Sequence, residues 1–184
     1  MSRIAFLAVV VLCASLALAQ QGQGQGRPQR PSNDTSIQDF KRAMAVQAAP
    51  DQISDFQLLA RNTEDARKQA HDLQTKSAGA SDSTGLYKPA STLKDTVDQV
   101  ENQMQSFVKG FTKAQSVLLK EQIKKMGKVQ SEISKQGKSL DEQLKRPAVD
   151  PKQLADLTDR LEKSLTDLQA QQRSLADEMG IPQS

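Results

Sequence analysis

Apolar residues recur at helical spacing along nearly the whole chain from Ser36 onward. No segment alternates between apolar and polar residues for long enough to suggest a strand. The hydrophobic content is 36%, with 3% aromatic residues and no Trp, which is low for a globular core. It is enough for helices that each bury one stripe. The sequence therefore predicts an all-α fold, an elongated antiparallel coiled coil or helical bundle of about four helices.

The third predicted helix is unusually long. No proline interrupts residues 91–144, and the apolar residues of this stretch fall within one sector of a helical projection. A continuous helix of this length would extend about 80 Å. Gly110, Gly127 and Gly137 are weak points in it, because glycine destabilises a helix interior. Gly137 is the most favourable point for a break, because Ser139 and Glu142 form a capping box that could start a new short helix. The alternative to an elongated arrangement is a compact four-helix bundle formed by a bend near Gly127.

The other predicted helices cover residues 36–47, 50–76 and 150–179. The last of these has clear end signals. Asp150 can cap it, Pro151 occupies the first helical position, and Gln153 can reach back to the cap. Gly180 can adopt the left-handed conformation that ends a helix.

Leucines repeat every seven residues in the last predicted helix, as in a coiled-coil seam. The seam residues are Leu154, Leu161, Leu165, Leu168, Leu175 and Met179. The short loop before this helix favours antiparallel pairing with the third helix, with Leu168 near Gln130. The long loop 77–89 pairs the second helix with the third in the same way, with Leu59 near Phe107. Pairing of the seam between two chains remains an alternative.

The N-terminal residues have the pattern of a signal peptide. Arg3 precedes an apolar run, and Ala17 and Ala19 are the small residues that a signal peptidase requires. The apolar run is shorter than the roughly 20 residues that span a bilayer, so we expect cleavage after Ala19 and a periplasmic or secreted protein. Cleavage would remove Cys13, the only cysteine, and leave a chain without disulfides.

The predicted domain organisation follows from composition. Residues 1–19 are a signal peptide, and residues 20–33, rich in Gln, Gly and Pro, are a disordered linker. Residues 34–184 form the helical coiled-coil domain.

One charged pattern exceeds the background. Ten basic and four acidic residues lie between Gln105 and Arg146. If the long helix is continuous, eight lysines lie within about 60° of one line, opposite the apolar stripe. They are possible contacts to an anionic surface: Lys109, Lys113, Lys120, Lys124, Lys128, Lys135, Lys138 and Lys145. A simple solvated face is the alternative interpretation.

Candidate chemistry is sparse. Di-iron bundles require a Glu three residues before each metal-binding His. The one histidine of this chain, His71, has no Glu at that position and is expected to be a solvated surface residue. We expect no catalytic, cofactor or metal site and no DNA binding. The expected function is that of an exported, non-catalytic helical interaction protein, such as a scaffold, adaptor or holdase, that binds a protein partner or itself through its helices. The alternative is a peripheral binder of an anionic envelope surface or an apolar ligand through the lysine-striped helix.

Overall fold

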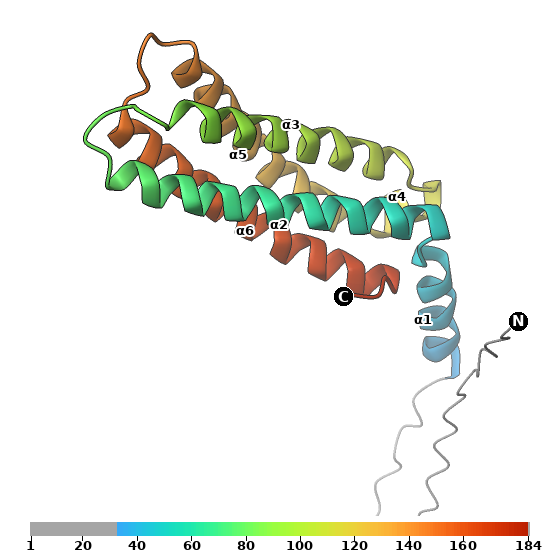
Figure 1. Ribbon diagram of the computed structural model, residues 1–184. Coiled ribbons are helices and arrows are strands. Elements are labelled where there is room, and N and C mark those ends of the chain that lie inside the picture. Colours follow the sequence, from blue (N-terminus) through green and yellow to red (C-terminus); the bar gives the residue numbers. More distant parts are fainter. Residues whose placement is uncertain (1–32, 184) are drawn as a thin grey trace, which may run out of the picture. The chain divides into compact units, whose positions relative to one another are not determined.

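The computed structural model describes residues 33–183, which form six α-helices and no strand (Figure 1). The all-α prediction is confirmed for this part of the chain. The predicted signal peptide, and the predicted linker as far as Ser32, lie outside the described residues. The helices are α1 (Asn33–Val46), α2 (Pro50–Ala78), α3 (Tyr87–Lys109), α4 (Lys113–Leu118), α5 (Lys120–Leu144) and α6 (Pro151–Met179).

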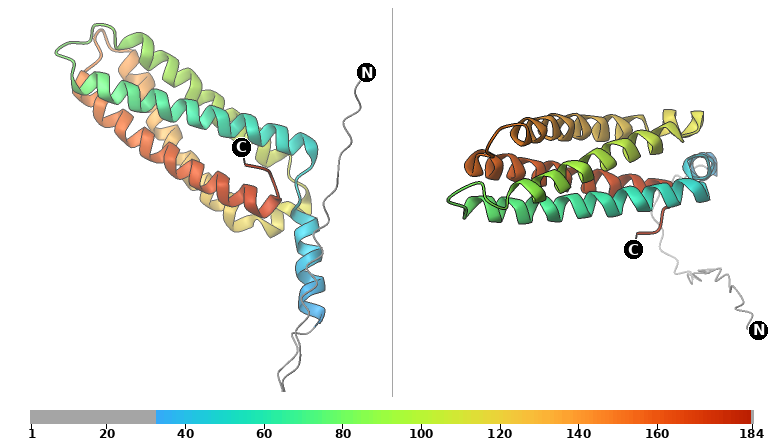
Figure 2. Two further views of the ribbon diagram at one scale, coloured as in Figure 1. Left: turned by 60° about the horizontal axis from the view of Figure 1, so that its bottom comes forward. Right: turned by 45° about the horizontal axis from the view of Figure 1, so that its top comes forward.

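The four long helices pack side by side as a bundle, each antiparallel to the next in the chain (Figures 1 and 2). Helix α2 contacts α3 and α6, and α5 contacts the same two helices from the other side. The hairpins have the register expected from the loops. Asn62 donates to Gln103 across α2 and α3, and Gln136 donates to Ser164 across α5 and α6. The apolar stripes of all four helices therefore meet in one core.

The prediction of one continuous helix over residues 91–144 is wrong. Helix α3 ends at Lys109, and a capping box begins α4. The Thr112 hydroxyl accepts from the Gln115 backbone N–H at 3.2 Å, and the Thr112 N–H donates to the Gln115 side chain at 2.9 Å. This reciprocal cap, directly after Gly110, stops one helix and starts another. The chain reverses here, so α5 packs back against α3.

The elongated arrangement is wrong for the same reason. A straight third helix would have placed α2 and α6 on opposite halves of a rod. The turn around α4 instead makes α2 and α6 neighbours along their length (Figure 2). The Thr63 hydroxyl and the Gln172 amide, both buried, meet at 2.9 Å across this interface. The bundle that was the alternative prediction forms, with its reversal near Gly110 and not near Gly127.

Helix α5 continues through both of the other glycines that were expected to weaken it. Gly137 is buried, and a Cβ atom there would lie 3.3 Å from Cγ1 of Val97 on α3. Gly127 is exposed, and a Cβ atom there would meet nothing within 4 Å. Gly137 therefore permits the close approach of α3 and α5, whereas Gly127 has no packing role.

These environments predict opposite results for two alanine substitutions. Gly127→Ala should stabilise the protein by about 0.5–1 kcal/mol, because alanine favours the helix and meets no neighbour. Gly137→Ala should give no gain, because the new methyl group presses on Val97 and offsets the helix propensity. Urea unfolding of both variants checks this. Equal stabilisation of both would contradict the close packing at Gly137.

Helix α6 begins and ends as predicted. The Asp150 carboxylate accepts from the backbone N–H groups of Lys152 and Gln153, and Gly180 has a φ of 65°. Ile181 is buried, and its N–H donates to the Ala176 carbonyl at 2.9 Å. The expectation for the Gln153 side chain is wrong: it accepts from Gln143 and Arg146 and does not reach back to the cap.

Helix α1 is joined to the bundle only near its C-terminal end. Val46 is buried, and the Ala48 N–H donates to the Met179 carbonyl at 3.0 Å. The contacts of α1 are with α4 and α6. The rest of the helix projects from the end of the bundle at which α4 lies (Figures 1 and 2).

Candidate functional site

Helix α1 exposes an apolar face. Ile37, Phe40 and Met44 have the i, i+3, i+7 spacing of one helical face, and they are 51%, 65% and 60% exposed. Val46, the residue of α1 that is buried in the bundle, lies on the opposite side of the helix at about 100° per residue. The apolar face therefore points away from the bundle. Val117 of the neighbouring α4 is also 66% exposed.

Two buried glutamines hold the base of α1 in place. The side chains of Gln52 on α2 and Gln115 on α4 hydrogen-bond to each other at 3.0 Å. Gln115 also donates to the carbonyls of Val46 and Gln47, and Gln52 donates to the carbonyl of Gly110. These amides join the α1–α2 junction to the turn between α3 and α4. These hydrogen bonds act at the base of α1 together with buried Val46 and the Ala48–Met179 backbone hydrogen bond, whereas residues 37–45 of the helix are exposed.

Sequence reasoning missed both glutamines. A signal was present, because Thr112 and Gln115 form a T-x-x-Q capping box two residues after Gly110. That motif marks a helix start within an apparently continuous helical pattern. Nothing in the sequence, however, indicates that Gln52 and Gln115 meet, because they are far apart in the chain.

The eight lysines expected to form one stripe are all exposed, but they do not lie on one helix. Lys109 ends α3 and Lys113 begins α4. The remaining lysines lie on α5, except Lys145, which is the residue directly after α5. Lys135 pairs with Glu132 at 2.8 Å. Lys145 pairs with Asp141 at 2.5 Å, and this contact raises the pKa of Lys145. The continuous stripe is therefore divided, and Lys135 and Lys145 in its distal part are paired with carboxylates.

Five of the six lysines of this predicted stripe that have no ion pair in the described chain lie toward the end of the bundle from which α1 projects. The structure places six exposed lysines there, on the last residue of α3, on α4 and in the first three turns of α5. This lysine cluster consists of Lys109, Lys113, Lys120, Lys124, Lys125 and Lys128. None of the six has an ion-pair partner within the described chain. Glu121 is the one acidic residue between Lys109 and Lys128.

The basic surface occupies one side of this end. Apart from Glu121 on α5 and the two aspartates of α1, the acidic residues at the same end lie on α2 and α6, at Asp51, Asp55, Asp177 and Glu178. Glu178 accepts a hydrogen bond from Gln122 of α5. The lysine cluster on the α3–α4–α5 side therefore keeps its net positive charge beside the base of α1.

The predicted seam residues of α6 are all fully buried within the single chain. Helix α6 packs against α2 on one side and α5 on the other. The leucine repeat therefore forms part of the core of the bundle. The seam offers no surface to a partner while the bundle is folded.

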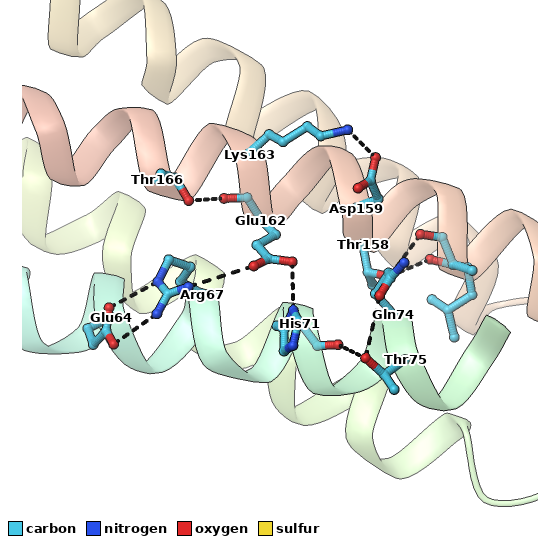
Figure 3. A network of polar contacts seen from close by, with 12 residues as sticks. Glu64, Arg67, His71, Gln74, Thr75, Thr158, Asp159, Glu162, Lys163 and Thr166 are labelled. Carbon is cyan, nitrogen blue, oxygen red and sulfur yellow. Dashed lines mark hydrogen bonds and ion pairs between the residues drawn. The ribbon is translucent and has the colours of Figure 1, made fainter. Parts of the chain in front are cut away.

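His71 lies on the surface and takes part in an ion-pair network between α2 and α6 (Figure 3). Its Nδ1 is 3.2 Å from Glu162, which also lies 3.7 Å from Arg67. Arg67 donates two hydrogen bonds of 3.1 Å to Glu64. Glu64 also accepts from Gln169 and pairs with Lys68. The network ties the two helices together.

Hydrogen bonds from Arg67, and then from Gln169 and Lys68, lower the pKa of Glu64 from 4.5 to about 2. A carboxylate with a lowered folded-state pKa stabilises the protein above its unfolded-state pKa, and this contribution is lost as the pH falls through the folded-state value. Glu64→Gln should therefore cost about 1 kcal/mol at neutral pH, a value reduced for solvent screening because the side chain is about one-third exposed. The difference from wild type should disappear between about pH 4.5 and 2.

Urea titrations at several pH values measure this dependence. The matched control is Asp167→Asn, since Asp167 is an exposed carboxylate of α6 with no ion pair among the described residues. Its effect should stay below about 0.5 kcal/mol at every pH. A pH-independent cost of Glu64→Gln would contradict the assigned role.

A groove of about 600 Å³ lies between α2, α6 and the C-terminal segment after α6. Arg61, Arg173 and Gln183 are among its lining residues. Phe56 at its floor is 5% exposed, so the groove offers little aromatic surface to a ligand. The apolar side chains on the face of α1 are far more exposed than the Phe56 side chain of this groove.

Comparison of the chain with protein-family models, with curated proteins and with solved structures finds no match. Among the described helices, none is both long and apolar enough to cross a membrane. No group of three or more His, Cys, Asp or Glu side chains suited to a metal ion occurs within residues 33–183. The function of this chain is therefore inferred from its own geometry.

Proposed function

We propose that this protein is an exported, non-catalytic interaction protein that binds its partner through one end of a helical bundle. The observation that carries the proposal is the exposed apolar face of α1, formed by Ile37, Phe40 and Met44. The apolar stripes of α2, α3, α5 and α6 are largely buried in a shared core. An amphipathic helix that leaves three large apolar side chains in water is typical of a binding surface.

The bundle provides a fixed support for this surface. The Gln52 and Gln115 amides hold the base of α1 against the α3–α4 turn. The Arg67–Glu162 ion pair and the His71–Glu162 contact connect two of the long helices, α2 and α6. In this proposal the polar side chains of the bundle serve packing and orientation, and no catalytic role is assigned to them.

The proposed location is the periplasm or the cell exterior. Support comes from the sequence pattern of residues 1–19, with a cut expected after Ala19. Mass spectrometry of the protein recovered from the exported fraction of expressing cells tests this part. An N-terminus at Gln20 is expected, and an intact Met1 in a protein retained inside the cell would contradict export.

Photo-crosslinking in cells tests the proposed surface. A photoreactive amino acid replaces Phe40 in one variant and Tyr87 in a matched variant. Tyr87 is also exposed, at 57%, but it begins α3 at the opposite end of the bundle. Adducts to protein or lipid should form at position 40 well above those at position 87. Equal or absent adducts at the two positions would reject α1 as the binding surface.

A further inference from the structure

We infer that the partner of the α1 end is the surface of an anionic lipid bilayer, in which the apolar face of α1 inserts while the lysine cluster contacts the headgroups. This inference rests on the proposed function, because it names the partner of the same surface. Two independent features of the structure meet at this end. One is the outward-facing apolar face of α1, and the other is a group of six exposed lysines without ion-pair partners in the described chain.

The form of α1 suits a bilayer interface. An interfacial helix lies in the plane of the headgroups with one apolar face in the acyl boundary and basic residues beside it. Lys41 borders the face of Ile37, Phe40 and Met44 at about 100° per residue. Because α1 touches the bundle only near its C-terminal end, the projecting turns can lie against a surface without a steric conflict along their length (Figure 2).

Charge favours an anionic surface over a second copy of this chain. In a symmetric dimer through α1, the lysine clusters of both copies would face the same region and repel each other. Helix α1 contacts α4, and two of these lysines lie close to that contact, Lys113 on α4 and Lys120 at the start of α5. On a surface of anionic headgroups, every nearby lysine contributes to the binding free energy, and its exact position matters little.

An acidic protein is the other anionic partner to consider. A protein interface buries roughly 800 Å² on each side and needs a shaped patch with well-packed anchors. The face of α1 is three side chains on a convex, projecting helix, with no groove wall described beside it. A bilayer accommodates such a helix without a complementary shape, and so the observations favour lipid.

Vesicle co-sedimentation of the purified exported protein, after its N-terminus has been determined, tests the inference. The probes are vesicles of mixed phosphatidylglycerol and phosphatidylcholine, and vesicles of phosphatidylcholine alone. Wild type should bind the anionic vesicles at least about tenfold more tightly, and this preference should fall steeply between low and physiological salt. Absence of binding to anionic vesicles would overturn the inference.

Two sets of variants locate the binding surface. The triple variant Ile37→Gln, Phe40→Gln, Met44→Gln changes exposed side chains and should weaken vesicle binding about tenfold or more. The triple variant Lys113→Gln, Lys120→Gln, Lys124→Gln should weaken it by a similar factor and flatten the salt dependence. Circular dichroism melts should match wild type in both, since none of these side chains is buried.

Control variants change the same kinds of exposed residue at the opposite end of the bundle. Tyr87→Gln removes an exposed aromatic residue there. The triple variant Lys76→Gln, Lys88→Gln, Lys152→Gln removes the same charge from α2, α3 and α6. Both should change binding by less than about twofold. A loss in the controls equal to that at the α1 end would overturn the inference.

The crosslinking experiment separates this inference from the proposed function. Protein adducts at position 40, together with no binding to anionic vesicles, would reject the lipid partner and retain α1 as an interaction surface. Failure of both experiments would reject the interaction surface itself. Lipid adducts at position 40 together with anionic vesicle binding would support both.

Discussion

Replacing Leu161 with alanine is expected to destabilise the protein by about 3 kcal/mol. Leu161 is fully buried in α6, which packs against both α2 and α5. Leucine-to-alanine changes in such sites cost about 2–5 kcal/mol, because transfer free energy is lost and a cavity remains. Urea unfolding measures the change, and for a domain of this size the melting temperature should fall by roughly 10 °C.

The matched control is Leu58→Ala on α2, since Leu58 is 50% exposed. It should cost less than about 0.5 kcal/mol. The unfolding midpoint of wild type and of Leu161→Ala should also be independent of protein concentration, because the α6 seam is buried within one chain. A midpoint that rises with concentration would place the seam between chains and contradict the bundle.

Local features of this fold could be predicted from the sequence. The cap of α6 at Asp150 and the left-handed Gly180 are determined by neighbouring residues. The hairpin registers follow from loop positions and the periodicity of the stripes. The Asn62–Gln103 and Gln136–Ser164 hydrogen bonds agree with the register that was predicted for each hairpin. Such features require no knowledge of which helices pack together.

The arrangement of the helices could not be predicted in the same way. Choosing between three glycines required knowing what each one contacts in the fold. Gly137 favours close packing against Val97, and Gly127 faces solvent, so neither breaks α5. The reversal occurs after Gly110. Glycine weakens the helix there, and the capping box of Thr112 and Gln115 starts a new helix directly afterwards. The predicted continuous helix had no reversal, and for this reason it separated α2 from α6.

The candidate surface shows a second limit. The spacing of Ile37, Phe40 and Met44 correctly places them on one face of α1. In an isolated sequence this pattern predicts a buried stripe, because most amphipathic helices pack their apolar face on a core. Whether the face is covered depends on the direction in which α1 leaves the bundle. The contacts that hold the base of α1 include the Gln52 and Gln115 amides, which helical periodicity does not detect.

Gln115 is buried, and its side chain hydrogen-bonds to three backbone groups at the base of α1 and at the α3–α4 turn.

 Replacing Gln115 with methionine keeps the length of the side chain but removes its hydrogen bonds. The carbonyls of Val46 and Gln47 and the N–H of Thr112 each lose a partner in a buried region. Unsatisfied buried polar groups cost about 1–3 kcal/mol, so we expect a loss of about 2–3 kcal/mol in the free energy of unfolding.

The effect of Gln115→Met should also be local, which hydrogen exchange can measure. Amide protection should fall at the base of α1 and at the α3–α4 turn more than in the centre of α6, because the lost hydrogen bonds join only those segments. The control is Gln105→Met, which changes an exposed glutamine of α3 and should alter stability by less than about 0.5 kcal/mol. If Gln115→Met left the exchange of α1 unchanged, the amide network would not be what orients α1, and the exposed apolar face would need another explanation. If protection fell as expected, the same variant should also weaken binding to anionic vesicles, since the insertion of α1 depends on a helix that is held at the lysine cluster.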